Sequence, residues 1–162
     1  MKKCYNGIIF LQETHCTEAD ESMWQKEFNG MGYFSNGTNQ SRGVVILIPN
    51  NLHIDIKVLS HISDSKGRLI MIKCEIESCI FSLINVYAPT RDHLAEQLSF
   101  IGEVSNILVN FGENNVIMGG DFNTHINIDL DKKGGVRNTY SKYTHLLENI
   151  IDEMDLVDIW RI

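Results

Sequence analysis

The chain has 162 residues, of which 43% are hydrophobic and 22% are charged, as is ordinary for one globular domain with a sizeable core. Its formal net charge of −7 argues against a general polyanion binder, because nucleic-acid-binding domains usually carry a basic surface, but it suits a site that concentrates a divalent cation. No apolar run is long enough for a membrane span and no signal peptide is evident. We therefore expect an intracellular protein, nuclear or cytoplasmic, that is not secreted.

The cysteines do not form a recognisable metal-binding pattern. They contain no Cys-x-x-Cys pair, and no matching His-x-x-x-His spacing accompanies them. A zinc site is therefore not expected, and a reduced intracellular protein is the simpler interpretation. The four cysteines are Cys4, Cys16, Cys74 and Cys79.

The first predicted elements are a strand and a helix. The continuous apolar run Ile8 to Leu11 is typical of a strand buried on both faces, and Gln12-Glu13-Thr14 gives it a polar end. Thr17 to Asp20 resembles a capping box and predicts a helix that Gly30 and Gly32 end. The apolar residues of this helix fall at helical spacing: Ala19, Met23, Trp24 and Phe28.

The middle of the chain is predicted to be rich in strands. Alternating apolar and polar residues mark Leu52 to Val58 as a strand with one wet face, and a polar stretch over Ser60 to Gly67 follows. Glu77-Ser78 turns one strand into the next, so we expect an antiparallel meander. The other predicted strands are Tyr33-Phe34, Val44 to Ile48 before Pro49, Leu69 to Ile76, and Cys79 to Tyr87.

Helices and a long loop are predicted in the last part of the chain. Ala88-Pro89-Thr90 is expected to stop the preceding strand and to cap an amphipathic helix over 94–111. The charged, glycine-rich segment from Thr124 to Asn138 is expected to be a surface loop over the site. A final helix is predicted over 143–154, and Leu156 to Trp160 is expected to begin another element.

The stretch from Val116 to Asn123 is the one around which the rest is organised. It reads as a short buried strand followed by Gly119-Gly120, which allow a close-packed exit, and then by Asp121-Phe122-Asn123. Because side chains alternate along an extended backbone, Asp121 and Asn123 are expected to project to the same side. Taken alone, Gly-Gly-Asp is also a common loop opener.

Two other predicted strands end in polar residues. Glu13 follows the first strand, and Asn85 and Tyr87 share one side of the strand that stops at Pro89. Ligand sites of layered α/β proteins gather at strand ends, so we expect these groups to meet Asp121 and Asn123. Their hard oxygen atoms suit magnesium or manganese, with a phosphoryl substrate completing the shell.

These motifs resemble a known family. In order along the chain, Leu11-Gln12-Glu13-Thr14-His15, Asn85-Val86-Tyr87-Ala88-Pro89 and Gly120-Asp121-Phe122-Asn123 match signatures of the endonuclease/exonuclease/phosphatase superfamily. The resemblance is closest to the endonuclease domains of non-LTR (long interspersed) retrotransposons and covers nearly the whole chain. The segments Arg42 to Leu47 and Asp155 to Arg161 fit as well.

The resemblance implies a fold and a chemistry. The fold is a two-sheet α/β sandwich of the DNase I-like type, and the chemistry is in-line phosphodiester hydrolysis with Mg²⁺ or Mn²⁺. Carried over by position, Glu13 is the metal ligand and Tyr87 contacts the scissile phosphate or the attacking water. Asp121 positions and polarises that water, and Asn123 orients the water or the phosphate.

Other residues beside the motifs receive less definite roles. Asn85 is either a structural amide or one that supports the residues touching the substrate. Arg42 is a candidate substrate contact. His15 and His125 lie near the site by sequence, and a surface position is favoured over direct contact for both. Basic residues in loops beside the motifs could form a local basic rim, namely Arg42, Arg91, Lys132, Lys133 and Arg137.

The resemblance also implies parts that this sequence lacks. Members of the family contribute an asparagine from a strand before the Gln-Glu-Thr motif and an Asp-His pair from a late strand, and neither is present here. We therefore expect residues 1–162 to be a single domain that is truncated at both ends. Because a positioned acid–base residue is commonly worth about 10²- to 10⁴-fold in rate, we expect weak or no activity from the isolated chain.

Three functions remain open. The first is a retrotransposon endonuclease that nicks DNA, with a downstream reverse transcriptase region in a longer polyprotein. The second is a cellular relative of the same fold, such as an abasic-site repair nuclease or a phosphatase, because the catalytic set barely distinguishes these. The third is a non-catalytic remnant that retains part of the fold.

Overall fold

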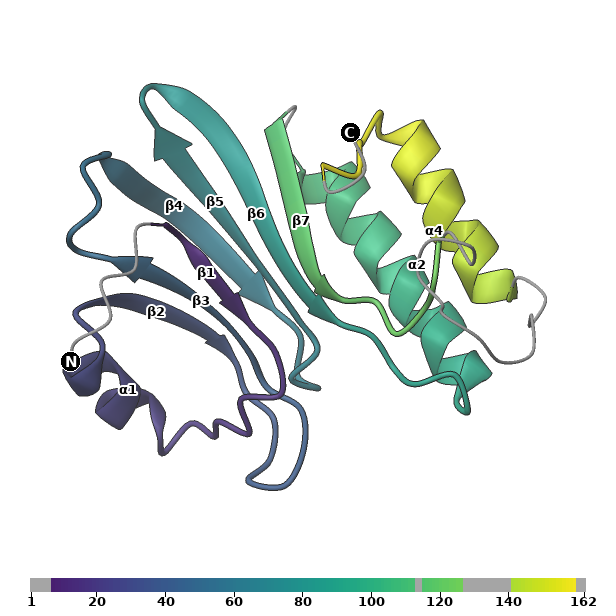
Figure 1. The fold of residues 1–162 in the computed structure, drawn as a ribbon, viewed down its shortest axis with the longest axis horizontal. Coiled ribbons are helices and arrows are strands. Elements are labelled where there is room, and N and C mark those ends of the chain that lie inside the picture. Colours follow the sequence, from purple (N-terminus) through teal and green to yellow (C-terminus); the bar gives the residue numbers. More distant parts are fainter. Residues whose placement is uncertain (1–6, 113–114, 127–140, 160–162) are drawn as a thin grey trace. The chain divides into compact units, whose positions relative to one another are not determined.

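The computed structural model describes residues 7–112, 115–126 and 141–159 of the chain. The chain divides into two compact units, drawn together in Figure 1. The first unit consists of Met1–Tyr87 and Gly112–Phe122, and the second of Ala88–Phe111 and Asn123–Ile162. Among the described residues, no helix has the length and apolar character needed to cross a membrane.

The first unit contains two β-sheets. One is three-stranded, in the order β1-β3-β2, and the other is four-stranded, in the order β4-β5-β6-β7. Every pairing is antiparallel except that of β6 with β7, which is parallel. The strands are β1 Ile9–Leu11, β2 Gly30–Ser35, β3 Val44–Pro49, β4 Ile56–Ser63, β5 Leu69–Ile76, β6 Cys79–Tyr87 and β7 Asn115–Asp121.

The core of the first unit is built from the central strands of both sheets. All of β3 is buried, because it has a partner strand on each side and apolar residues throughout. Its side chains join those of β5 and β6 in one apolar cluster, so the predicted two-sheet α/β fold is confirmed. The cluster consists of Val44, Ile46, Ile48, Ile70, Ile72, Cys74 and Leu83.

Two strands differ from the prediction that they are fully buried. Residues 8–11 were expected to be covered on both faces, but β1 is only half-buried. The strand that carries Asp121 is likewise partly exposed, with Ile117 at 49% exposure. Both differences have the same cause, because among the described strands β1 and β7 each lie at the end of a sheet and pair with a single neighbour.

The segment between β1 and β3 also departs from the prediction. The helix α1 spans Glu21–Glu27 and begins after Thr17–Asp20, because the Asp20 carboxylate accepts hydrogen bonds from both the main-chain N–H and the hydroxyl of Thr17 and closes a separate turn. Gly30 and Gly32 do not end the helix but lie within β2. At Gly30 a Cβ would collide with the carbonyl oxygen of Ile48 on β3, so the close pairing of these strands explains this glycine.

The strand β4 is displaced along the sequence from its predicted position. Leu52 and Ile54 precede it, and it continues through the polar stretch to Ser63 with an irregularity in register between Val58 and Ser60. A strand at the end of a sheet needs only one apolar face, so its main-chain pairing with β5 extends into polar sequence. The predicted meander of β5 and β6 is confirmed, with Glu77 and Ser78 both at positive φ in the turn.

In the described part of the second unit, two helices lie side by side (Figure 1). The helix α2 spans Leu94–Phe111, and α4 spans Lys142–Glu153. Thr90 does not cap α2, because it lies in a separate turn before the helix, where its main-chain carbonyl accepts a hydrogen bond from the N–H of His93. The predicted amphipathic helix thus has the expected bounds, but the apolar residues at its two ends, Leu94 and Phe111, are 45% and 50% exposed.

The C-terminal predictions are confirmed in part. Ser141 caps α4 by accepting a hydrogen bond from the N–H of Thr144, and α4 buries Tyr143, Thr144, Leu147 and Ile150. Residues 156–159 form neither a helix nor a strand. Other predictions lie outside the described residues, namely those for Cys4, Trp160, Lys132, Lys133, Arg137 and most of the loop over 124–138.

Candidate active site in the first unit

Glu13 lies just beyond the end of β1, in a backbone conformation that is unusual for glutamate. Its φ is 51°, in the left-handed region, and that of His15 is 53°. Main-chain hydrogen bonds hold this segment, from the Thr14 N–H to the Gly43 carbonyl (3.1 Å) and from the His15 N–H to the Arg42 carbonyl (2.9 Å). Left-handed residues of this kind cluster at functional sites, because the surrounding structure must offset their strain.

The side chain of Glu13 contacts Tyr87, which ends β6. The phenol hydroxyl of Tyr87 donates a hydrogen bond to Oε1 of Glu13. This hydrogen bond is the main cause that raises the pKa of Tyr87 above its ordinary value of 10.0, with burial and the charge of Glu13 adding to it. The phenol is therefore protonated at neutral pH and can act as a hydrogen-bond donor.

Arg68 is a residue of this site that the sequence analysis missed. It immediately precedes β5, and its guanidinium carbon lies 5.4 Å from the centroid of the Tyr87 ring. Two hydrogen bonds also join Arg68 to the main chain of Tyr87. The Tyr87 N–H donates to the Arg68 carbonyl (2.7 Å), and the side-chain Nη1 of Arg68 donates to the Tyr87 carbonyl (3.2 Å). The positive charge of Arg68 partly offsets the rise in the pKa of Tyr87.

Asp121 lies at the end of β7, directly opposite Tyr87 in the parallel pairing of β6 and β7. Its carboxylate is exposed, and its charge adds slightly to the raised pKa of Tyr87. Gly120 precedes it with a φ of 133°, and a Cβ there would collide with the carbonyl oxygen of Val86. Only glycine therefore lets β7 approach β6 closely enough to set Asp121 beside Tyr87.

Asn85 is completely buried and connects the two sheets of the first unit. Its Nδ2 donates to the carbonyls of Leu11 and Val45, both at 2.9 Å, and its Oδ1 accepts from Nε2 of Gln12 at 2.7 Å. Of the two roles left open for it, these contacts support the structural one. They fix the end of β1, from which Glu13 projects, against β6, which carries Tyr87.

Asn123 does not follow the strand alternation that was predicted for it. The strand β7 ends at Asp121, and Asn123 has a φ of 48°. It belongs to the second unit, where its Nδ2 donates to the Ala88 carbonyl at 2.7 Å. The argument that alternation sends Asn123 and Asp121 to one side was therefore wrong, and the role of Asn123 stays a prediction.

Three other predicted neighbours of the site have limited contacts in the structure. Arg42 contributes its main-chain carbonyl to the segment after Glu13 and itself has a φ of 67°. His15 is exposed, whereas His125 is half-buried in the second unit. Their roles as substrate contacts stay predictions.

The donor groups of the first unit suit a magnesium-type ion. Glu13 and Asp121 both offer exposed carboxylates, and each acts electrostatically on the same phenol. Within the described part of the chain, no group of three or more His, Cys, Asp or Glu side chains is arranged to hold a metal. Mg²⁺ commonly takes one or two carboxylates and keeps several waters, so this sparse, all-oxygen set fits it better than it fits zinc.

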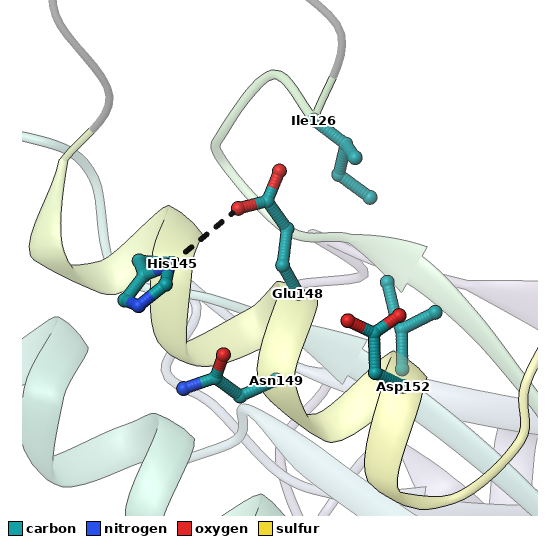
Figure 2. Close-up of a pocket in the computed structure, with 6 residues that line it drawn as sticks. Ile126, His145, Glu148, Asn149 and Asp152 are labelled. Atoms are coloured by element: carbon teal, nitrogen blue, oxygen red, sulfur yellow. Dashed lines mark ion pairs between the residues drawn. The ribbon is translucent and has the colours of Figure 1, made fainter.

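A separate hollow in the second unit is not lined by any predicted site residue. It has a volume of about 340 Å³ and lies along α4, as Figure 2 shows. The ring nitrogen Nδ1 of His145 lies 3.9 Å from Oε2 of Glu148 at its rim. The hollow is lined by Ile126, His145, Glu148, Asn149, Ile151 and Asp152.

No protein-family model matches the chain, but one curated protein does. It is the transposon TX1 uncharacterized 149 kDa protein of Xenopus laevis, which is 32% identical over 157 residues. The match covers 96% of this chain and 11% of that protein. The chain is therefore similar to a small segment of a much larger transposon protein.

Solved structures share the fold at low sequence identity. An AP endonuclease from Archaeoglobus fulgidus has a TM-score of 0.59 and 17% identity, over 90% of this chain and 60% of that one. D. rerio TDP2 complexed with a single-strand DNA product has a TM-score of 0.53 and 12% identity, over 94% of this chain and 53% of that one. The chain thus spans little more than half the length of these proteins, and the likeness establishes the fold.

Proposed function

We propose that the chain is a member of the endonuclease/exonuclease/phosphatase superfamily, that it hydrolyses phosphodiesters with a divalent cation, and that it nicks DNA as a retrotransposon-type endonuclease domain. Residues 1–162 are taken as one domain of a longer polyprotein with a reverse transcriptase region downstream. The relationship to a 149 kDa transposon protein supports this context. The DNA product in the TDP2 complex supports DNA as the substrate class for this fold.

The observation that carries the proposal is the hydrogen bond from Tyr87 to Glu13, with Asp121 paired opposite Tyr87. Three motifs that are far apart in the sequence thus deliver a carboxylate, a phenol and a second carboxylate to neighbouring strand ends of the first unit. Such a set of oxygen groups at strand ends suits a phosphate held with a magnesium-type cation.

The chemistry assigns each residue a step. Glu13 would hold the cation, which would supply neutralisation of the charge on the phosphate oxygens. Asp121 orients a water molecule and accepts a proton from it as the water oxygen attacks phosphorus. The bond to the leaving oxygen breaks, and that oxygen takes up a proton from solvent. Tyr87, still protonated, turns its hydroxyl hydrogen bond from Glu13, which would then hold the cation, to a phosphate oxygen where negative charge develops. For Asn123 we keep the predicted role of orienting the water or the phosphate.

The test is Mg²⁺-dependent nicking of supercoiled plasmid by the chain and by its Glu13→Gln and Asp121→Asn variants. Glu27→Gln and Asp55→Asn are matched controls, because both residues are exposed and lie outside the motifs. We expect the wild type to nick the plasmid slowly, and a chelator to abolish this activity. Both site variants should nick at least about 100-fold more slowly, whereas both control variants should nick at the wild-type rate. Equal nicking by the site variants and the wild type would refute the assignment.

A duplex that contains an abasic site, used as a second substrate, separates the retrotransposon endonuclease from the other two candidate functions. Cleavage confined to duplexes that contain an abasic site would favour a repair nuclease over a retrotransposon enzyme. Absence of cleavage, together with no Mg²⁺- or Mn²⁺-dependent rise in melting temperature, would favour a non-catalytic remnant, because a ligand that binds only the folded state stabilises it.

A further inference from the structure

Asp64 lies in the turn between β4 and β5, outside the predicted motifs. Oδ1 of Asp64 accepts the main-chain N–H groups of Arg68 (2.9 Å) and Leu69 (3.0 Å). The same oxygen accepts the hydroxyl of Ser35 at 2.6 Å. One carboxylate oxygen therefore closes the turn over 64–69 and ties it to β2, which belongs to the other sheet.

The other oxygen of Asp64 is evidence that this arrangement has a purpose beyond local stability. Oδ2 is buried and has no hydrogen-bond partner within the described residues. Leaving a buried carboxylate oxygen unsatisfied opposes folding, and such groups in native structures require an explanation. A turn that served only as a connection could use a neutral serine or asparagine at lower cost.

The turn delivers Arg68 to the candidate active site. The main chain of Arg68 is held on one side by Asp64 and on the other by the N–H of Tyr87, at 2.7 Å. Its guanidinium then lies against the Tyr87 ring and donates to the Tyr87 carbonyl. The ring is thereby confined between Arg68 and Glu13, which accepts its hydroxyl hydrogen bond.

We propose that Asp64 is a positioning residue for the reaction, acting through Arg68 to hold the Tyr87 ring in the orientation from which its hydroxyl reaches the phosphate. Its effect on rate rests on the proposed function, whereas its effect on the geometry of Tyr87 does not. A planar guanidinium can stack on a ring and donate to a carbonyl at once, which a lysine ammonium cannot do in the same way. The precise placement of Arg68 therefore matters as much as its charge.

The test compares Asp64→Ala with Asp64→Asn, which retains Oδ1 as the acceptor, and uses the exposed Asp55→Ala as a control. Amide hydrogen exchange is measured at Arg68, Leu69 and Tyr87, and nicking kinetics are measured with plasmid. We expect Asp64→Ala to speed exchange at all three amides and to lower kcat by about 10- to 100-fold with KM within about threefold. Asp64→Asn should keep amide exchange and kcat close to those of the wild type, and Asp55→Ala should change neither amide exchange nor kcat.

The two readouts separate the possible failures. Faster exchange at Arg68 and Leu69 with unchanged exchange at Tyr87 would mean that Asp64 only caps its own turn, and would overturn the proposal. If the wild type does not nick DNA, the kinetic readout is lost, and exchange at Tyr87 alone decides this inference. Should Asp64→Ala not fold, Ser35→Ala removes only the link to β2, and the same two measurements on that variant decide between the outcomes.

Discussion

The phenol of Tyr87 donates a hydrogen bond to the carboxylate of Glu13, although 74 positions separate the two residues in the chain. Glu13 follows a strand of the three-stranded sheet, and Tyr87 ends a strand of the four-stranded sheet. The contact therefore depends on how the two sheets pack on each other. Substitutions that loosen this packing should affect the site even when they do not touch it.

Replacing Tyr87 with phenylalanine should separate the chemistry of the hydroxyl from the packing of the ring. The variant keeps the ring against Arg68 but loses the donor to Glu13, so nicking should fall about 100-fold while the free energy of unfolding changes by only about 1 kcal/mol. Plasmid nicking and urea denaturation measure the two effects. Tyr33→Phe is the control, because the Tyr33 hydroxyl contacts only Met31 Sδ, at 3.8 Å, among the hydrogen bonds described. An equal loss of nicking in both variants would contradict the role of Tyr87.

Asn85→Ala should destabilise the first unit strongly. It removes three hydrogen bonds and leaves two carbonyl groups and one amide without their partner in the core, so unfolding should require roughly 3 kcal/mol less free energy. Asn115→Ala serves for comparison, because it removes one exposed hydrogen bond to the Ile80 carbonyl and should cost less than about 1 kcal/mol. Denaturant titration of both variants tests this, and similar losses would count against Asn85 as the link between sheets.

Two glycine-to-alanine substitutions should act in opposite directions. Gly120→Ala adds a Cβ at a φ of 133°, where it meets the Val86 carbonyl oxygen, and should destabilise the protein by at least about 2 kcal/mol and abolish nicking. Gly102→Ala lies in α2 with open space around it and should stabilise the protein by up to about 1 kcal/mol. Thermal unfolding distinguishes the two, and a tolerated Gly120→Ala would show that β7 can shift away from β6.

Alkaline pH should destabilise the fold partly through Cys16. Burial, and then the charges of Asp20 and Glu21, raise the pKa of the Cys16 thiol from its ordinary value of 9.0 to about 11. The folded state holds this proton more tightly than the unfolded state does. The resulting contribution to the free energy of unfolding is therefore complete below pH 9 and is lost as the pH rises towards 11. Its size is on the order of 2–3 kcal/mol.

Cys16→Ala provides the measurement for this effect. The variant should show a smaller fall in the free energy of unfolding between about pH 8 and about pH 11 than the wild type does. Three other groups also have raised pKa values, but they are present in both proteins, so their contributions cancel in the comparison. These groups are Tyr33, Cys74 and Tyr87. Parallel pH dependence of the two proteins would rule out Cys16 as a contributor.

Much of the fold followed from local patterns in the sequence, and one residue of the site could have been found in the same way. The apolar runs of β3, β5 and β6 and the turn at Glu77-Ser78 predicted the meander that the structure contains. A two-residue turn there also fixes the register, which pairs Leu69 with Val86 and sets Arg68 opposite Tyr87. Counting back from the turn would therefore have identified Arg68.

Other features depend on contacts that a single sequence does not encode locally. Some hydrogen bonds join segments of different sheets, namely the one from Ser35 to Asp64 and those of Asn85. No residue spacing in the sequence predicts them. The left-handed conformation of Glu13 is likewise imposed by tertiary contacts with the segment around Arg42 and Gly43. Asn123 was misjudged because the pattern did not reveal that β7 ends at Asp121.

The parallel pairing of β6 with β7 has a consequence for synthesis on the ribosome. Glu13, Arg68 and Tyr87 all emerge before residues 88–114 are made, whereas Asp121 emerges only after them. Tyr87 and Glu13 can thus associate before Asp121 has been made. Until then, the edge of β6 that pairs with β7 has no partner strand. During translation, Glu13 and Asp121 are therefore brought together late, when β7 pairs with β6.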